Sequence, residues 1–294
     1  MKDVLLRGLS RPADLRVILV EATDLSRMAR MLHDLAPTSA SIFAEALTAG
    51  LLLGALQKDQ TRINLSLEVD GPLSGLLVDA DTSGNIRGRV RQPALHFPGD
   101  PAVGPRAALG GAGTLSVLRD LGNGEFYRGS VEFVPGTLTE NLRRYFASSE
   151  QVATALDIRV VAAGAEPLGA VAGIVVQKMP EGSLRALEEV RARIAGGAFR
   201  EALASGATDE ALAGSVVGGG LEVLTRGPVS YVCNCSRERA VNAVSALGPA
   251  GIRDVLAKEK QVVIDCEFCK KRYVIEEAEL RDMARRLEGG LPAC

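Results

Sequence analysis

The sequence lacks tryptophan and contains few aromatic residues of any kind. Aromatic side chains make up 4% of the 294 residues, and such rings are what proteins use to stack nucleic-acid bases. The chain also lacks an excess of one charge, because 34 basic side chains stand against 36 acidic ones, for a formal net charge of −2. A dedicated nucleic-acid-binding protein needs a cationic surface, so we expect no nucleic-acid partner.

Long apolar runs are also missing. The two longest, Leu47–Leu56 and Leu168–Val176, stop near ten residues, whereas a membrane-spanning helix needs about 20. The N-terminus, Met1–Val4, does not open the apolar stretch that marks a secretory signal. We therefore expect a cytoplasmic protein without a membrane partner. In that reducing compartment cysteines stay as thiols unless a metal or a reaction uses them.

No constellation of catalytic side chains is evident in the sequence. The two histidines, His33 and His96, have no partner at metal-ligand spacing, and we expect a helix-end capping role for the first and a loop for the second. The glycines at 110–113 are not followed by Lys and Ser or Thr, so no ATP phosphate loop is expected. Ser148–Gln151 offers hydroxyls without an identifiable base. We predict that the protein is not an enzyme.

What the chain does contain is a series of alternating strand patterns joined by short turns. The segments that read as strands are Ile63–Val69, Leu73–Ala80, Ile86–Arg91, Thr114–Arg119 and Tyr127–Val134. Short hairpin connections favour antiparallel pairing. The expected fold class is therefore α+β rather than a doubly wound parallel sheet.

Helical patterns lie between these strands. Thr23 can cap a first helix that buries three apolar side chains at helical spacing: Leu25, Met28 and Leu32. A second begins at Thr38 or Ser39 and continues to Leu56. Thr137–Glu140 has the spacing of a capping box, in which a hydroxyl and a carboxylate each satisfy a free backbone amide.

Composition divides the chain into three expected units. Residues 1–178 read as an N-terminal core domain of mixed helices and antiparallel strands, 179–230 as a helical linker and 231–294 as a C-terminal four-cysteine domain. Ser183 can cap a linker helix that presents Leu184, Leu187, Val190 and Ile194. Ala, Gly and two glycine breaks make the linker's own cohesion marginal. A stable helical hairpin packed on the main domain fits the same composition.

Four of the five cysteines form the most informative motif. The pair Cys233 and Cys235 is followed, after thirty residues, by the pair Cys266 and Cys269. Two close pairs separated by a folded segment supply the tetrahedral ligand set of a structural zinc. Four sulfurs leave no open position for water, so a structural or redox site is favoured over a hydrolytic one. Cys294 matches no position of this motif.

The segments around these cysteines resemble a known family. Tyr231–Arg239 (YVCNCSRER) and Asp265–Tyr273 (DCEFCKKRY) are similar to the redox-regulated holdase chaperones of the HslO type, the thirty-three-kilodalton heat-shock family. Similar patches at His33–Pro37, Arg87–Val90 and Gln177–Pro180 extend the resemblance across the chain.

This resemblance implies a mechanism. In the reduced, inactive state it implies one zinc ion on Cys233, Cys235, Cys266 and Cys269. On oxidation it implies the disulfides Cys233–Cys235 and Cys266–Cys269, zinc loss and unfolding of the linker. The oxidised protein would then bind unfolded or aggregation-prone client proteins without ATP during oxidative stress, and a homodimer is compatible with that state.

Two other functions would use the same cysteines. A thiol–disulfide oxidoreductase would work through Cys266 and Cys269, although no thioredoxin-like βαβ pattern surrounds that pair. A constitutive zinc ribbon would dock nucleic acid or a protein partner. Its balanced charges and few aromatic residues make nucleic acid the weaker choice.

Overall fold

The computed structural model describes residues 3–58, 61–98, 103–150 and 152–288. The chain divides into two compact units, Met1–Val232 and Cys233–Cys294. The strands of the first unit are β1 (Val4–Ser10), β2 (Leu15–Glu21), β3 (Arg62–Val69), β4 (Gly75–Asp81), β5 (Asn85–Val90), β6 (Gly113–Asp120), β7 (Phe126–Phe133), β8 (Thr154–Ala163), β9 (Glu166–Lys178), β10 (Leu221–Gly227) and β11 (Ser230–Tyr231). Its α-helices are α1 (Thr23–His33), α2 (Pro37–Leu56), α3 (Val103–Leu109), α4 (Leu138–Ser149), α5 (Leu184–Ala195), α6 (Ala198–Ala204) and α7 (Asp209–Val217).

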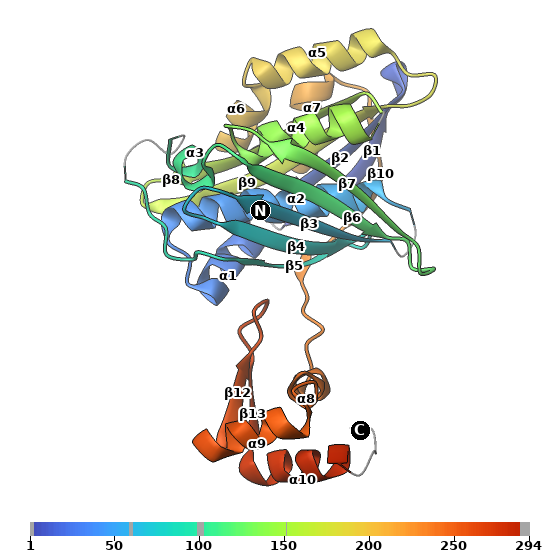
Figure 1. The fold of residues 1–294 in the computed structure, drawn as a ribbon. Coiled ribbons are helices and arrows are strands. Elements are labelled where there is room, and N and C mark those ends of the chain that lie inside the picture. Colours follow the sequence, from blue (N-terminus) through green and yellow to red (C-terminus); the bar gives the residue numbers. More distant parts are fainter. Residues whose placement is uncertain (1–2, 59–60, 99–102, 151, 289–294) are drawn as a thin grey trace. The chain divides into compact units, whose positions relative to one another are not determined.

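Two sheets enclose the long helix α2 in the first unit (Figure 1). The order is β10-β1-β2-β9-β8 in the five-stranded sheet, and β11-β5-β4-β3-β6-β7 in the six-stranded sheet. Neighbouring strands pair antiparallel, except that β11 runs parallel to β5. The expected α+β class is confirmed, as are the five strands read from alternation, whose bounds move by two residues at most.

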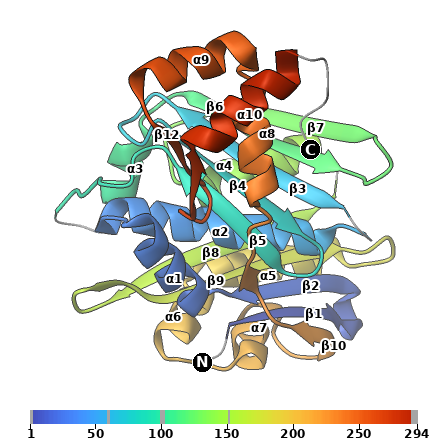
Figure 2. The ribbon, with the colours of Figure 1, turned by 90° about the horizontal axis from the view of Figure 1, so that it is seen from below.

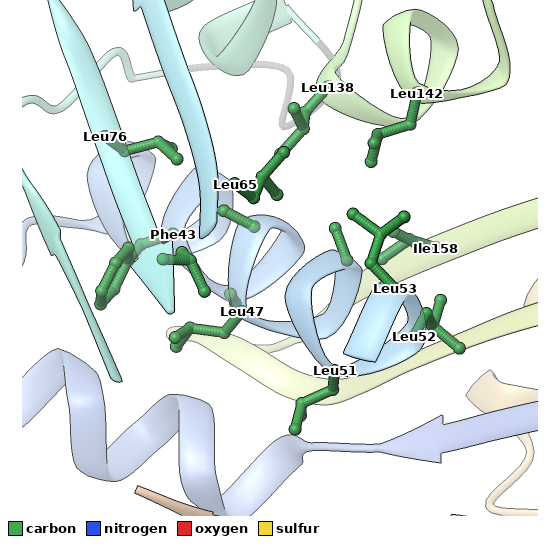
Figure 3. Packing of buried hydrophobic residues seen from close by; sticks show 14 of the residues in the cluster. Phe43, Leu47, Leu51, Leu52, Leu53, Leu65, Leu76, Leu138, Leu142 and Ile158 are labelled. Atoms are coloured by element: carbon green, nitrogen blue, oxygen red, sulfur yellow. The ribbon is translucent and has the colours of Figure 1, made fainter. Parts of the chain in front are cut away.

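Helix α2 is the centre of the main apolar core. Figure 3 shows Phe43, Leu47 and Leu51–Leu53 of this helix facing Leu65 and Leu76 of the strands, Leu138 and Leu142 of α4, and Ile158 of β8. Alone among the described residues, Pro37–Leu56 is long and apolar enough to cross a membrane, with a hydropathy of 1.6, yet 89% of that window is buried inside the structure. Packing between the two sheets therefore accounts for the apolar character of this helix, which starts at Pro37, one residue before the predicted start.

Two other expected helices, α4 and α1, test the predictions made for their first residues and buried faces. The capping box is confirmed: Thr137 Oγ1 accepts from the Glu140 amide at 3.2 Å, and the Glu140 carboxylate accepts from the Thr137 amide at 2.8 Å. The expected capping by Thr23 was wrong: Ala22 occupies the cap position of α1, Thr23 is the first helical residue, and its hydroxyl accepts from the Val171 amide at 2.9 Å. The expectation that Met28 is buried was wrong, because Met28 is 40% exposed and the face against the core carries Leu25 and Ala29.

A second apolar cluster lies on the opposite face of the five-stranded sheet. Strand side chains alternate between the two clusters, so that Ile18 and Val175 face α2 while Leu19 and Ile174 face the other way. Helices α5, α6 and α7 cover that other face (Figures 1 and 2). Their buried side chains are Leu187, Val190, Ile194, Phe199, Leu203, Leu212, Ala213 and Val216, whereas Leu184 is exposed.

The second unit is small and has its own core. It consists of α8 (Arg237–Ser245), α9 (Gly248–Lys258), β12 (Gln261–Asp265), β13 (Arg272–Glu276) and α10 (Glu277–Glu288). Strands β12 and β13 form a two-stranded antiparallel hairpin. The fully buried core side chains are Val244, Ile252, Ile275, Leu280, Met283 and Ala284. With so little apolar material, this unit gains a large share of its stability from any additional cross-link.

Candidate metal centre

The first cysteine pair lies between β11 and α8. Cys233 and Cys235 occupy an irregular stretch that ends where Ser236 caps α8, its hydroxyl accepting from the Arg239 amide at 3.2 Å. Arg237 then fixes the helix to the rest of the unit, donating to the Val274 carbonyl at 3.0 Å and to the Glu279 carboxylate at 2.6 Å. The helix start therefore sets where the two thiols lie.

The second pair occupies the turn of the β12–β13 hairpin. The Cys266 amide donates to the Lys271 carbonyl at 2.9 Å, and the Lys270 amide donates to the Cys266 carbonyl at 2.8 Å. Lys270 adopts a left-handed conformation with φ of 57°. This tight turn, closed at its base by the Asp265–Arg272 ion pair at 2.8 Å, places both thiols on one side of the hairpin.

The four sulfurs converge. All Sγ atoms of Cys233, Cys235, Cys266 and Cys269 lie within 4.8 Å of one another, with Cys233–Cys266 at 3.7 Å and Cys235–Cys269 at 3.3 Å. Zinc–thiolate bonds of about 2.3 Å in tetrahedral geometry place the sulfurs about 3.8 Å apart. The donor set therefore fits a single metal ion. No other group of His, Cys, Asp or Glu among the described residues meets the same spacing.

The hydrogen bonds among these thiols separate their pKa values. Burial opposes ionisation of Cys235, but hydrogen bonds from Tyr273 and the other three cysteines lower its pKa to about 7. Burial, together with the neighbouring cysteines, raises the pKa of Cys269 to about 12, and burial raises the pKa of Cys233. The Cys235 thiolate is thus favoured near neutral pH, whereas ionisation of Cys233 and Cys269 is opposed unless a cation balances their charge, as a bound metal ion does.

Tyr273 is a site residue that the cysteine spacing does not reveal. Its hydroxyl donates to Cys235 Sγ at 3.1 Å, and this hydrogen bond raises the Tyr273 pKa to about 12, so the hydroxyl remains a donor. The ammonium group of Lys271 lies 5.5 Å from the centre of the tyrosine ring. The signal available in the sequence was an aromatic hydroxyl four residues after Cys269. Cys294 lies outside the described residues.

Comparison with known proteins gives one consistent result. The family model described as Hsp33 protein matches residues 3–276. The 33 kDa chaperonin of Geobacillus sp. (strain WCH70) is 32% identical over 292 residues, which cover 98% of this chain and 99% of the relative. The 33 kDa chaperonin of Listeria monocytogenes serovar 1/2a is 30% identical and covers 96% of this chain and 98% of its own.

The same relationship appears in three dimensions. The crystal structure of the 33 kDa chaperonin of Thermotoga maritima superposes with a TM-score of 0.86 at 25% sequence identity. The match covers 97% of this chain and 98% of the other, so both units described above are included.

Proposed function

The chain belongs to the Hsp33 family of chaperones, and we propose that it is a redox-regulated, ATP-independent holdase of the cytoplasm. Its partners in this proposal are unfolded proteins that accumulate under oxidative stress. The reduced form holds one zinc ion and is inactive, whereas the oxidised form binds clients. The convergence of four cysteine sulfurs in a small unit carries the proposal, because it couples thiol chemistry to the stability of a fold.

The proposed zinc ligands are Cys233, Cys235, Cys266 and Cys269. Four thiolates suit zinc by charge and softness, and with all positions filled the ion supplies a cross-link rather than an activated water. Apparent binding free energies of structural zinc in small peptides are about 10–16 kcal/mol, and much of that is folding free energy. A unit whose buried core consists of six side chains would depend on it.

The proposed switch is oxidation of both pairs by a peroxide. A thiolate attacks one oxygen of hydrogen peroxide to give a sulfenic acid and hydroxide, and the second thiol of the pair then displaces that hydroxyl group as water to form the disulfide. One peroxide is reduced for each disulfide. The pairs Cys233–Cys235 and Cys266–Cys269 follow from family resemblance. In the thiol form the separations of 3.7 Å and 3.3 Å join sulfurs of different pairs and all four lie within 4.8 Å of one another, so the pairing does not rest on distance. Two disulfides leave no thiolate to retain the ion.

The proposed response is release of the linker helices from the five-stranded sheet. Helices α5 to α7 hold a separate apolar cluster with Leu19 and Ile174 of the sheet, and unfolding them would expose both sides of it. Exposed apolar area of this kind binds unfolded chains by the hydrophobic effect and needs no nucleotide. This is the surface that we assign to clients.

The position of the second cysteine pair argues against the alternative, a thiol–disulfide oxidoreductase. Cys266 and Cys269 lie in the turn of an antiparallel hairpin rather than between a strand and a helix of a βαβ unit. An oxidoreductase of the thioredoxin type uses a low-pKa thiol at the start of a helix, and neither Cys266 nor Cys269 lies at such a position.

The test measures zinc, free thiols and suppression of aggregation of a denatured protein, before and after peroxide treatment. We expect one zinc per reduced chain, zinc release in step with the loss of four thiols, and holdase activity only afterwards. Cys294→Ser is the matched control: it removes one thiol from the reduced count and should leave the zinc content, the loss of four thiols on oxidation and the holdase activity unchanged. Zinc retained after Cys233 and Cys235 are both replaced by Ser would contradict the ligand assignment.

A further inference from the structure

The chain crosses from one sheet to the other just before the first cysteine pair. It leaves β10 at the edge of the five-stranded sheet and enters β11 at the edge of the six-stranded sheet (Figure 2). The Ser230 amide donates to the Gly84 carbonyl at 2.9 Å, and the Val232 amide donates to the Ile86 carbonyl at 2.8 Å. A two-residue strand at a sheet edge is a weak attachment by its backbone alone.

One side chain strengthens this attachment. The Tyr231 hydroxyl donates to the Gly88 carbonyl at 2.8 Å, accepts from the Gly88 amide at 3.2 Å and lies 2.9 Å from His33 Nε2. His33 is 5% exposed at the end of α1, with its ring edge-on to Phe43 at 5.4 Å and to Tyr231 at 6.2 Å. A single hydroxyl therefore joins β11 to β5 and to α1.

Two glycines that accept hydrogen bonds from the crossing segment, Gly84 and Gly88, lie where a larger side chain would not fit. A Cβ at Gly88 would lie 2.9 Å from the Leu77 carbonyl oxygen and 2.9 Å from the Phe43 ring. A Cβ at Gly84 would lie 2.6 Å from the Pro228 carbonyl oxygen, and Gly84 has φ of +87°. A larger residue at Gly84 would thus obstruct the crossing segment, and one at Gly88 would displace the Phe43 ring on which His33 packs.

We propose that Tyr231 is a latch residue that keeps the linker closed while the cysteines are reduced. Tyr231 stands four residues after the end of β10 and two residues before Cys233, so β11 lies on the chain path between the proposed switch and the linker. While the Tyr231 hydroxyl is hydrogen-bonded, unfolding of the chain around the cysteines does not extend past β11. Once it is released, β10 and helices α5 to α7 lose their fixed end. This gating role rests on the proposed holdase function.

The test compares Tyr231→Phe with Tyr127→Phe in the full-length, reduced and zinc-loaded protein. Tyr231→Phe keeps the ring that packs on the core and removes only the hydroxyl. Tyr127 lies half-exposed on β7, so its variant controls for loss of a tyrosine hydroxyl elsewhere. We expect the Ser230 and Val232 amides of Tyr231→Phe to exchange about tenfold faster, which corresponds to about 1.4 kcal/mol. Zinc content and thiol count should equal those of the wild type.

The second readout is the peroxide exposure that gives half-maximal suppression of aggregation. Tyr231→Phe should reach it at lower thiol oxidation than the wild type, whereas Tyr127→Phe should match the wild type. Unchanged exchange at Ser230 and Val232 would overturn the latch. Faster exchange with an unchanged activation threshold would overturn its gating role. A wild type that never gains activity on oxidation would instead refute the proposed function, and the exchange result would still decide whether Tyr231 holds the strand.

Discussion

At the scale of single residues, the sequence predicts the thiols and misses what surrounds them. Four cysteines at this spacing indicate a common site because each pair has a short bite, and the structure brings all four sulfurs together. Tyr273 and Tyr231 carry no such signal. Their hydroxyls find Cys235, Gly88 and His33 only through pairing of distant segments, which spacing along the chain does not report.

A buried carboxyl in the five-stranded sheet makes stability depend on pH. Burial, then the charges of Asp209 and Asp3, raise the pKa of Glu21 to about 7. The unfolded chain therefore ionises Glu21 at lower pH than the folded chain does, and folding loses stability as the pH rises from about 4.5 to 7. Allowing for solvent screening, we expect a loss of roughly 1 kcal/mol. Asp209 is the first residue of α7, so we expect this loss of stability to weaken the packing of the linker helices on the five-stranded sheet.

Glu21→Gln removes this loss. In urea titrations, the difference in unfolding free energy between variant and wild type should shift in the variant's favour by roughly 1 kcal/mol from pH 4.5 to pH 8. Glu132→Gln, which replaces an exposed carboxylate on β7, is the matched control for the loss of one carboxylate elsewhere. A difference for Glu21→Gln that stays constant over this range would show that the carboxyl titrates normally.

At the scale of elements, alternation finds strands that have one buried face and overlooks those that have two. The hairpins of the six-stranded sheet alternate and were predicted. Strand β9 does not alternate, because α2 covers one of its faces and the linker helices cover the other, so Val171–Gln177 is buried throughout. Such a run cannot be distinguished from a helix segment by its period. Strand β9 was therefore not predicted. Strand β10 has exposed residues on both sides of its pattern and was missed because residues 179–230 were read as a helical linker.

Gly173 marks the closest approach of β9 to α2. A Cβ there would lie 2.6 Å from Thr48 Cγ2 and 2.9 Å from Leu52 Cδ1. Gly173→Ala should therefore destabilise the first unit by about 1–3 kcal/mol through overpacking. Gly214, within α7, has open space around it, and Gly214→Ala should be neutral or stabilising by up to about 1 kcal/mol. Thermal unfolding measures both, and equal effects at the two positions would contradict the packing argument.

At the scale of the whole molecule, the two apolar clusters of the first unit differ in whether their buried side chains come from the linker helices. The cluster around α2 is built from buried residues between Leu5 and Val175, whereas the cluster on the other face of the sheet needs helices α5 to α7. The buried side chains of the main core thus all come from outside the linker. In the proposed function, this separation would let the protein expose a binding surface while its main core stays folded.

A fragment that ends at Pro180 should show this directly. We expect it to melt cooperatively, because its main core is complete, and to bind an apolar dye more strongly than the full-length reduced protein does, because Leu19 and Ile174 are uncovered. The full-length reduced protein is the control. A soluble fragment without a cooperative transition would contradict the independence of the core.

Hydrogen exchange on the reduced and oxidised full-length protein, with an aggregation assay on the same samples, decides whether linker unfolding accompanies holdase activity. We expect residues 181–230 to lose protection when zinc is lost, the core around α2 to keep it, and holdase activity to appear in the same samples. Activity that appears while residues 181–230 stay protected would contradict it.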